Sequence, residues 1–161
     1  MTQDNSPNLL LTTLQRAHSA FLSLGNVNGT ERSRGISAMA KALSQSFDRI
    51  LEANTLDLEV SREMAVSDDL LDWLKLTPER LETTVELLEQ LVELPDPIQR
   101  VMNAPYQLNP SQTYCQLMPL GVVSLIYEVF PELGAIAAGF CLKTGNSLVL
   151  RGCGASSHSN L

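Results

Sequence analysis

The sequence is poor in cysteine, histidine, aromatic residues and positive charge. Its 161 residues include 3 cysteines, 2 histidines and 5% aromatic residues, and 11 lysines and arginines stand against 18 aspartates and glutamates. The net charge of −7 and the scattered basic residues argue against a nucleic-acid-binding protein, because phosphate contacts need clustered lysine and arginine. An odd number of cysteines without paired spacing argues against a disulfide framework and predicts a reducing, cytoplasmic compartment. The few cysteines and histidines show no metal-ligand spacing, so no metal site is predicted.

Long apolar runs are also missing. No run approaches the about 18 apolar residues of a membrane span, so we expect no membrane association. The polar opening MTQDNSPN lacks the basic and apolar regions of a secretory signal. What is present, 44% hydrophobic and 18% charged residues, is typical of a globular protein whose chain can bury about two thirds of its unfolded surface.

The first half of the chain has a helical pattern. From residue 9 to 94, apolar residues recur at intervals of three and four, which places them on one face of a helix. A first stripe consists of Leu10, Leu14, Ala17, Phe21 and Leu24. A second helix is predicted with Thr30 as its cap and a stripe made of Ile36, Met39, Ala40, Leu43, Phe47, Ile50 and Leu51.

Further helices are predicted after it. Asn54 and Thr55 can cap a short helix over 55–65, and Ser67, followed by two aspartates, can cap another turn. Thr77 as cap and Pro78 at the first helical position open a longer helix. The prolines of LPDP, residues 94–97, end that helix. We interpret the acidic residues between 52 and 96 as solvated helix faces.

The period changes after Pro97. Residues 106–118 suggest a loop and an extended ribbon, and the β-branched LGVVSLIY suggests a strand covered on both faces. The small apolar ELGAIAAGFCLK suits a helix packed closely on a sheet, with Gly145 as its stop. SLVLR then reads as a second buried strand, and SSHSNL as the start of another helix. Strand, helix and strand in this order predict a right-handed parallel crossover.

These motifs carry a resemblance to a known family. PLGVVSLIYEVFP, LKTGNSLVLRG and the closing SN resemble gamma-glutamyl phosphate reductase, also called glutamate-5-semialdehyde dehydrogenase, of the aldehyde dehydrogenase superfamily. ILEANTLDLE, LLDWLKLTPERL and LPDPI resemble the amino-terminal pattern of the same family. The predicted fold is therefore α/β: a helical amino-terminal region over 1–98, followed over 99–161 by the first βαβ unit of an aldehyde-dehydrogenase-type nucleotide-binding domain, present in part.

The resemblance implies NADPH-dependent reduction of L-glutamyl 5-phosphate to glutamate 5-semialdehyde in proline biosynthesis. It implies that Tyr127 and Glu128 lie along the NADP groove, and that Arg151, Gly152, Cys153 and Gly154 lie near the adenosine end of the cofactor. Ligands of parallel sheets bind beyond the carboxyl ends of the strands, where these residues are expected. Glycines allow close backbone approach, and an arginine can pair with a 2′-phosphate. Taken alone, GCG favours a plain connection between a strand and a helix, because most such turns have only that role.

The superfamily's nucleophilic cysteine is implied to lie downstream of SN, and none of the three cysteines matches its surroundings. We expect Cys141 to be core packing and Cys115 to be structural. Cys153 lies in a glycine turn that is expected to be exposed, and His158 is the nearest residue that could act as its base. The alternative for His158 is a solvated residue without a catalytic role. His18 is expected on the surface. No catalytic residue is assigned, and the chain alone is expected to be inactive.

Five features of the sequence, four single residues and one run of three, depart from the family pattern. Trp73 and Phe130 stand where arginines are usual, and Gln99 stands where a glycine is usual. The run ELG, residues 132–134, replaces asparagine-valine-threonine. Ala155 stands where the family usually has a glutamate, and the resemblance implies that this glutamate binds the ribose of the cofactor.

Three hypotheses follow from the sequence. The first is a truncated piece of a reductase whose remainder supplies the nucleophile. The second is a non-catalytic relative that acts as a binding or scaffold module. The third is a chain that associates with itself or with reductase subunits as an oligomer.

Overall fold

The computed structural model describes residues 6–98, 101–103 and 114–160. Within these residues, helices dominate the first half and a small parallel sheet the second. The elements in order are α1 (Ser6–Leu24), α2 (Gly29–Ser44), α3 (Phe47–Glu63), α4 (Asp68–Leu74), α5 (Pro78–Glu93), β1 (Val101–Asn103), β2 (Tyr114–Gln116), β3 (Val122–Ile126), α6 (Leu133–Lys143), β4 (Ser147–Arg151) and the 3-10 turn η1 (Gly154–Ser156). The α/β fold class predicted from the sequence is confirmed.

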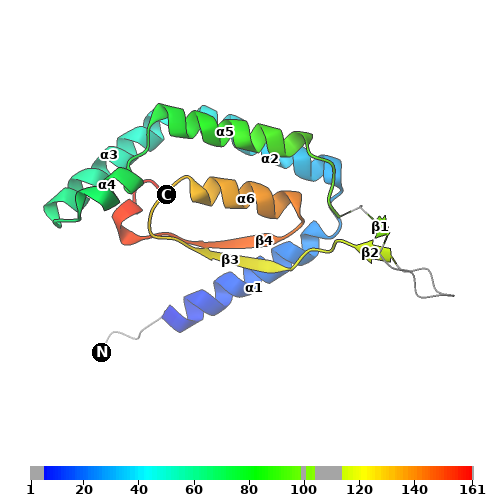
Figure 1. Ribbon diagram of the computed structural model, residues 1–161. Helices are drawn as coiled ribbons and strands as arrows, with labels where there is room; N and C mark the ends of the chain where they lie inside the picture. The colour runs from blue at the N-terminus through cyan, green and yellow to red at the C-terminus, as the bar shows by residue number, and fades with distance from the viewer. Residues whose placement is uncertain (1–5, 99–100, 104–113, 161) are drawn as a thin grey trace.

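The elements form layers around α6 (Figure 1). The paired helices α2 and α5 lie on one side of α6, and the β3–β4 sheet lies on the other. The core consists of apolar side chains from α2 and α5, joined by Leu142 of α6: Ile36, Ala40, Leu88 and Leu91. Burial of these side chains supplies the main driving force for packing.

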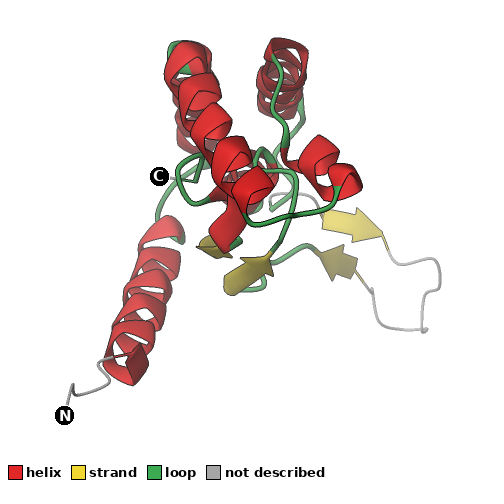
Figure 2. Cartoon of the chain, turned by 90° about the vertical axis from the view of Figure 1, so that its left-hand side faces the viewer, coloured by secondary structure: helices red, strands yellow, loops and turns green. Residues whose placement is uncertain are grey.

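Helix α1 lies against the other face of the sheet, and its amino-terminal end extends away from the sheet (Figure 2). The predicted helix is confirmed, but its apolar stripe is only partly covered. Ala17 is buried, whereas Leu10 and Leu14 at the amino-terminal end are exposed. The spacing of apolar residues predicts which face of a helix is buried, but it does not predict how much of the helix length a packing partner covers.

The boundary between α2 and α3 differs from the prediction. Asn28, not Thr30, caps α2: its side chain accepts from the backbone N–H of Glu31 at 3.0 Å, and the Glu31 carboxylate accepts from the Asn28 N–H at 3.0 Å. This reciprocal pair is a capping box. The single helix predicted to reach Leu51 is broken at Gln45 and Ser46, and the helix predicted over 55–65 is the second half of α3.

The predicted cap at Asn54 is also wrong. Asn54 lies inside α3 and is buried, and its side-chain amide donates to the Leu74 carbonyl at 2.9 Å. Its side-chain oxygen accepts from the Leu76 N–H at 2.8 Å. Asparagine is a poor residue for a helix interior, so these tertiary bonds explain why it is found there.

The start of α5 is as predicted. The Thr77 hydroxyl accepts from the Arg80 N–H at 3.3 Å, Pro78 occupies the first turn, and the helix ends at Glu93 with Leu94 as its C-cap. At α4, Ser67 stands at the cap position but makes no side-chain cap bond within the described part of the chain. The two aspartates of its first turn are present as expected.

Strands β3 and β4 are parallel and joined through α6, which confirms the predicted parallel strand–helix–strand unit. Their register runs from Val122 paired with Ser147 to Ile126 paired with Arg151. Gly145 has φ +70°, the left-handed conformation that ends α6 as predicted. β1 and β2 pair antiparallel, which confirms an extended ribbon that includes Tyr114–Gln116.

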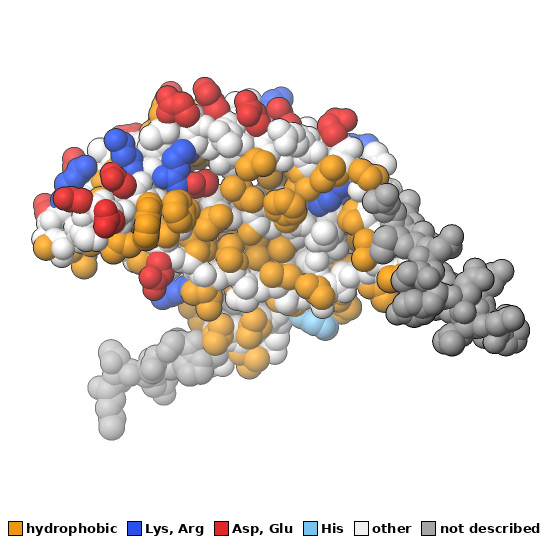
Figure 3. Space-filling model, viewed as in Figure 1, with side chains coloured by type: hydrophobic (Ala, Val, Ile, Leu, Met, Phe, Trp, Pro, Cys, Tyr) orange, Lys and Arg blue, Asp and Glu red, His pale blue; other side chains and the backbone are white. Residues whose placement is uncertain are grey.

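Coverage of the strands on both faces is not observed among the described residues. Ser124 and Ile126 of β3 and Leu150 of β4 are exposed, Ile126 by 76%. Figure 3 shows hydrophobic side chains gathered over α6 and β3 on the side of the molecule that it presents, and the exposed apolar side chains of these two elements include Ile126 and Phe140. Helix α1 covers the face opposite α6 only in part, so the second covering layer that a parallel sheet needs is incomplete among the described residues.

Candidate functional site

The ends of β3 and β4 bring the predicted cofactor residues together. Because the two strands are parallel and in register, the chain leaves both at the same edge of the sheet. The Tyr127 N–H continues the ladder by donating to the Arg151 carbonyl at 3.1 Å. Tyr127 and Glu128 therefore lie beside Arg151 and the turn over 152–154. We call this group of residues the strand-end edge.

The side chains of the strand-end edge differ in exposure. Glu128, Arg151 and Gly154 are exposed, Gly152 and Cys153 are half-buried, and Tyr127 is buried at 9% exposure. The exposed members can meet a ligand directly. Tyr127, by contrast, contributes through the interior of the protein.

Tyr127 is turned toward the loop that follows β4. Its hydroxyl donates to the Asn160 side-chain oxygen at 2.7 Å. Burial raises the pKa of the Tyr127 phenol, so the hydroxyl stays protonated and remains a donor. A Cβ on Gly134 of α6 would lie 3.0 Å from the Tyr127 hydroxyl, so this glycine allows the close approach.

The glycine turn after β4 is shaped by close contacts. A Cβ on Gly152 would lie 2.4 Å from the side-chain nitrogen of Asn160, so only glycine fits there without displacing that side chain. The space around Gly154 is open, because a Cβ at this position would meet no atom of the described residues within 4 Å. The Cys153 sulfur accepts from the Ala155 N–H at 3.3 Å, and η1 closes with a bond from the Ser156 N–H to the Cys153 carbonyl at 3.3 Å.

Asp57 anchors the end of this loop to α3. Its carboxylate is 2% exposed and accepts from the backbone N–H groups of His158 at 3.0 Å and Ser159 at 2.7 Å. The Ser159 hydroxyl donates to it at 2.6 Å, and His158 Nδ1 lies 2.7 Å from it. Burial alone would raise the pKa of Asp57, but the hydrogen bonds from Ser159 and His158 outweigh burial and lower that pKa.

The interpretation of all acidic residues from 52 to 96 as solvated is therefore wrong at Asp57. It is also wrong at Asp96, which pairs with the buried Arg32. A signal for Asp57 existed in the sequence. Asn54 and Asp57 are three positions apart in a helix, on one face, and both are poor residues for a helix interior unless they have partners elsewhere in the fold.

A cavity of about 190 Å³ lies between the strand-end edge and the helical layer. Its apolar lining includes Leu43 of α2, Ile50 of α3 and Leu81 of α5 on one side, and Ala135 of α6 and Leu150 of β4 on the other. Its polar lining comes from Thr84, Tyr127, Glu132, Ser159 and Asn160. The cavity joins the loop that Asp57 anchors to the first turn of α6.

Three of the departures from the family pattern lie together beside this cavity. The rings of Trp73 and Phe130 are 6.0 Å apart, and the Arg80 guanidinium lies 5.4 Å from the Phe130 ring centre. Glu132 forms an ion pair with Arg80, whose Nε donates to it at 3.0 Å. Phe130 has φ +59°, and its N–H donates to the Trp73 carbonyl at 3.3 Å. The positive charge of Arg80 is thus neutralised within the chain. Gln99, another departure, lies outside the described residues.

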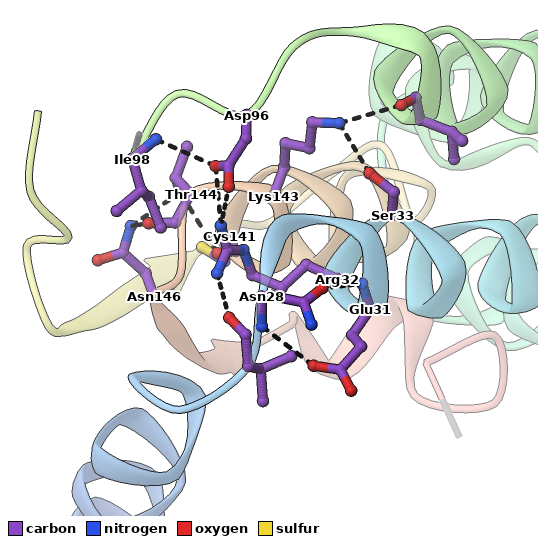
Figure 4. Close-up of polar contacts among 12 residues, drawn as sticks. Asn28, Glu31, Arg32, Ser33, Asp96, Ile98, Cys141, Lys143, Thr144 and Asn146 are labelled. Atoms are coloured by element: carbon purple, nitrogen blue, oxygen red, sulfur yellow. Dashed lines mark hydrogen bonds and ion pairs between the residues drawn. The ribbon is translucent and has the colours of Figure 1, made fainter. Parts of the chain in front are cut away.

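The opposite end of the sheet is held by a separate polar network (Figure 4). Arg32 pairs with Asp96, and the buried Lys143 donates to the Ser33 hydroxyl at 2.9 Å and to the Val92 carbonyl at 3.0 Å. Lys143 thereby satisfies a carbonyl of the last turn of α5. A wider hollow of about 530 Å³ opens here at the start of α2, but it does not adjoin the carboxyl ends of the strands.

The cysteines and histidines were predicted with mixed success. Cys141 is buried and burial raises the pKa of its thiol, which confirms a packing role. Cys115 is exposed on β2, and the structural role expected for it stays a prediction. Cys153 is half-buried rather than exposed. His18 is exposed as expected, whereas His158 contacts Asp57 and is not simply solvated.

Metal clusters and membrane-spanning helices are both absent from the described residues. No group of three or more histidine, cysteine, aspartate or glutamate side chains in that part of the chain is arranged to hold a metal ion. None of the helices described is long and apolar enough to cross a membrane.

Comparison with known proteins decides the family. The chain is 67% identical over 159 residues to gamma-glutamyl phosphate reductase 2 of Synechocystis sp., a match that covers 99% of this chain and 38% of the relative. The chain is homologous to the amino-terminal part of the gamma-glutamyl phosphate reductases. The crystal structure of the reductase from Thermotoga maritima superposes with a TM-score of 0.81 at 28% identity, over 94% of this chain and 36% of that one. No family model matches the chain.

The wider fold is that of the aldehyde dehydrogenases. An aldehyde dehydrogenase from Bacillus cereus superposes with a TM-score of 0.57 at 22% identity, over 83% of this chain and 26% of that one. This likeness concerns the fold alone. The chain thus spans less than two fifths of the length of the reductases that it resembles.

Proposed function

We propose that this chain forms the amino-terminal part of an NADPH-dependent gamma-glutamyl phosphate reductase, acting in proline biosynthesis in the cytoplasm. In this proposal the strand-end edge holds the cofactor. The observation that carries it is the parallel pair β3–β4, which places Glu128, Arg151 and the turn over 152–154 at one edge. Ligands of parallel sheets bind at this position.

The residues present fit the cofactor in part. Arg151 is exposed and able to pair with a 2′-phosphate, and the open space around Gly154 lets a ligand approach the backbone. Tyr127 fits as a support, because its hydroxyl is bonded to Asn160. Ala155 offers no carboxylate to a ribose. When bound, NADPH would supply the hydride that reduces the acyl group of L-glutamyl 5-phosphate.

This chain's own residues would therefore bind and orient rather than attack. Cys141 is buried with its pKa raised, and Cys153 accepts a hydrogen bond from Ala155 within its own turn. Neither thiol lies in the surroundings that activate a nucleophile, namely an exposed site beside a base or cation. We propose that the nucleophile comes from outside the matched part of the family, and that the protein assembles as an oligomer.

Calorimetric titration with NADPH and NADH tests the proposal. We expect saturable binding with a preference for NADPH, and Arg151→Gln should weaken NADPH binding about tenfold and remove the preference, because one charge-assisted hydrogen bond is lost. Arg49→Gln, which changes an exposed arginine of α3, is the matched control and should bind as the unaltered chain does. If neither nucleotide binds, the proposal fails and a binding or scaffold module becomes the better hypothesis.

A further inference from the structure

Asp57 holds the loop after β4 from a helix far away in the chain. Four hydrogen bonds join its two carboxylate oxygens to His158 and Ser159, across a sequence separation of 101 and 102 residues. Asn54, one turn earlier on α3, adds a bond from its amide to the Ser159 hydroxyl at 3.2 Å. The carboxylate itself is 2% exposed. These hydrogen bonds offset the free-energy cost of burying the Asp57 charge, because an unpaired buried carboxylate would be strongly destabilising.

The loop has little structure of its own. Between Gly152 and Asn160 the regular structure consists of η1, and the loop's backbone bonds are those from Ser156 N–H to Cys153 and from Asn160 N–H to Ser156. The N–H groups of His158 and Ser159 lie in the turn that follows η1, and their acceptor is the Asp57 carboxylate. Asp57 supplies both acceptors and a negative charge at that position.

The anchored end of the loop touches the strand-end edge. Asn160 follows Ser159 directly, accepts from the Tyr127 hydroxyl at 2.7 Å and lies against Gly152. Its side-chain amide also donates to the Ser156 hydroxyl at 2.8 Å. Any shift of residues 158–160 is therefore transmitted to Gly152, which is covalently joined to Arg151.

We propose that Asp57 is a positioning residue, which fixes the loop after β4 so that Arg151 and the glycine turn keep the shape that the cofactor needs. The anchoring half of this proposal stands on the geometry of this chain. The cofactor half rests on the function proposed above. Asp57 does not touch the cofactor, and it acts through Ser159, Asn160 and Gly152.

Hydrogen exchange of the folded Asp57→Asn variant tests the anchor without any cofactor. Oδ1 of Asp57 accepts from His158 and Oδ2 accepts from Ser159, so an asparagine keeps the acceptor for only one of these residues, and its NH₂ group faces the donors of the other. We expect the amides over 156–160 to exchange about tenfold faster or more, as the loss of a charge-assisted bond implies. Glu59→Gln, on an exposed position of the same helix, should leave them unchanged. Unchanged exchange in a folded Asp57→Asn variant overturns the proposal.

Ser159→Ala provides a second variant if Asp57→Asn does not fold. It removes the 2.6 Å hydroxyl bond and leaves both backbone bonds in place. The readout is the ¹⁵N spectrum of His158. With Asp57 beside Nδ1, we expect that nitrogen to carry the proton in the neutral ring, and the populations of the two tautomers should shift in either variant. Identical spectra and identical exchange in Ser159→Ala overturn the proposal.

NADPH affinity separates failure of the anchor from failure of the proposed function. If the unaltered chain binds NADPH, Asp57→Asn should weaken binding about tenfold, and Glu59→Gln should not. Equal affinity in a variant whose loop has been released shows that Asp57 does not position the site. If the unaltered chain does not bind NADPH, the proposed function fails, and the exchange and ¹⁵N data alone decide on the anchor.

Discussion

Arg32 and Asp96 form an ion pair across 64 positions of the chain. The Arg32 Nη2 lies 2.8 Å from each carboxylate oxygen of Asp96, and another guanidinium nitrogen donates to the Val27 carbonyl. The side chains are 6% and 17% exposed, respectively. The pair joins α2 to the turn after α5, and so closes the helical layer over α6.

Asp96→Asn should lower the free energy of unfolding by about 3 kcal/mol, because it leaves the buried Arg32 charge without its partner. Urea unfolding measures the change. Asp72→Asn, on an exposed position of α4, should stay within about 0.5 kcal/mol of the unaltered chain. Similar losses in both variants would show that the ion pair contributes little.

Leu88 marks the centre of the core. It is 1% exposed, whereas its neighbour Leu87 is 41% exposed on the same helix. Leu88→Ala should lower the free energy of unfolding by about 3 kcal/mol through lost burial and an added cavity. Leu87→Ala should change it by less than about 1 kcal/mol. Equal effects in chemical unfolding would contradict the packing of α5 described above.

Ala65 sits in a conformation that favours glycine. It follows α3 with φ +57°, and the Val66 N–H donates to the Ser61 carbonyl at 3.1 Å, as in a Schellman motif. Ala65→Gly should stabilise the protein by about 1 kcal/mol, or raise Tm by about 2–4 °C. Ala38→Gly, on an exposed position inside α2, should destabilise it by about 1 kcal/mol. A fall in Tm for Ala65→Gly would contradict the left-handed backbone.

Acid should weaken the protein partly through Asp57. The pKa of Asp57 in the folded protein lies below its ordinary value of 3.8, so the unfolded state binds a proton more readily. The resulting stability is present above the ordinary pKa and is lost as pH falls through the folded pKa. Urea midpoints measured from pH 6 downward should therefore decline less steeply for Asp57→Asn than for the unaltered chain. Parallel curves would show that Asp57 is not stabilised as a carboxylate.

Much of the fold follows local rules and was predictable. Thr77 and Pro78 open α5 because cap and proline chemistry act within one turn. The order of β3, α6 and β4 was likewise predicted from apolar runs and Gly145. These signals need no knowledge of distant residues.

Other features depend on contacts between distant residues. The interior positions of Asn54 and Asp57 in α3 are explained only when Leu74, Leu76 and the loop after β4 are in place. Partners about a hundred residues away leave no periodic pattern. The strand-end edge was predicted as a set of residues, but the inward direction of Tyr127 was not.

Hydrogen exchange with and without NADPH tests the central claim, that the ends of β3 and β4 hold the cofactor, most directly. We predict that NADPH slows exchange over 127–128 and 151–154, and that Arg151→Gln reduces this protection at the same nucleotide concentration. Protection confined to another region, such as the hollow at the start of α2, or no protection at a saturating concentration would contradict the account.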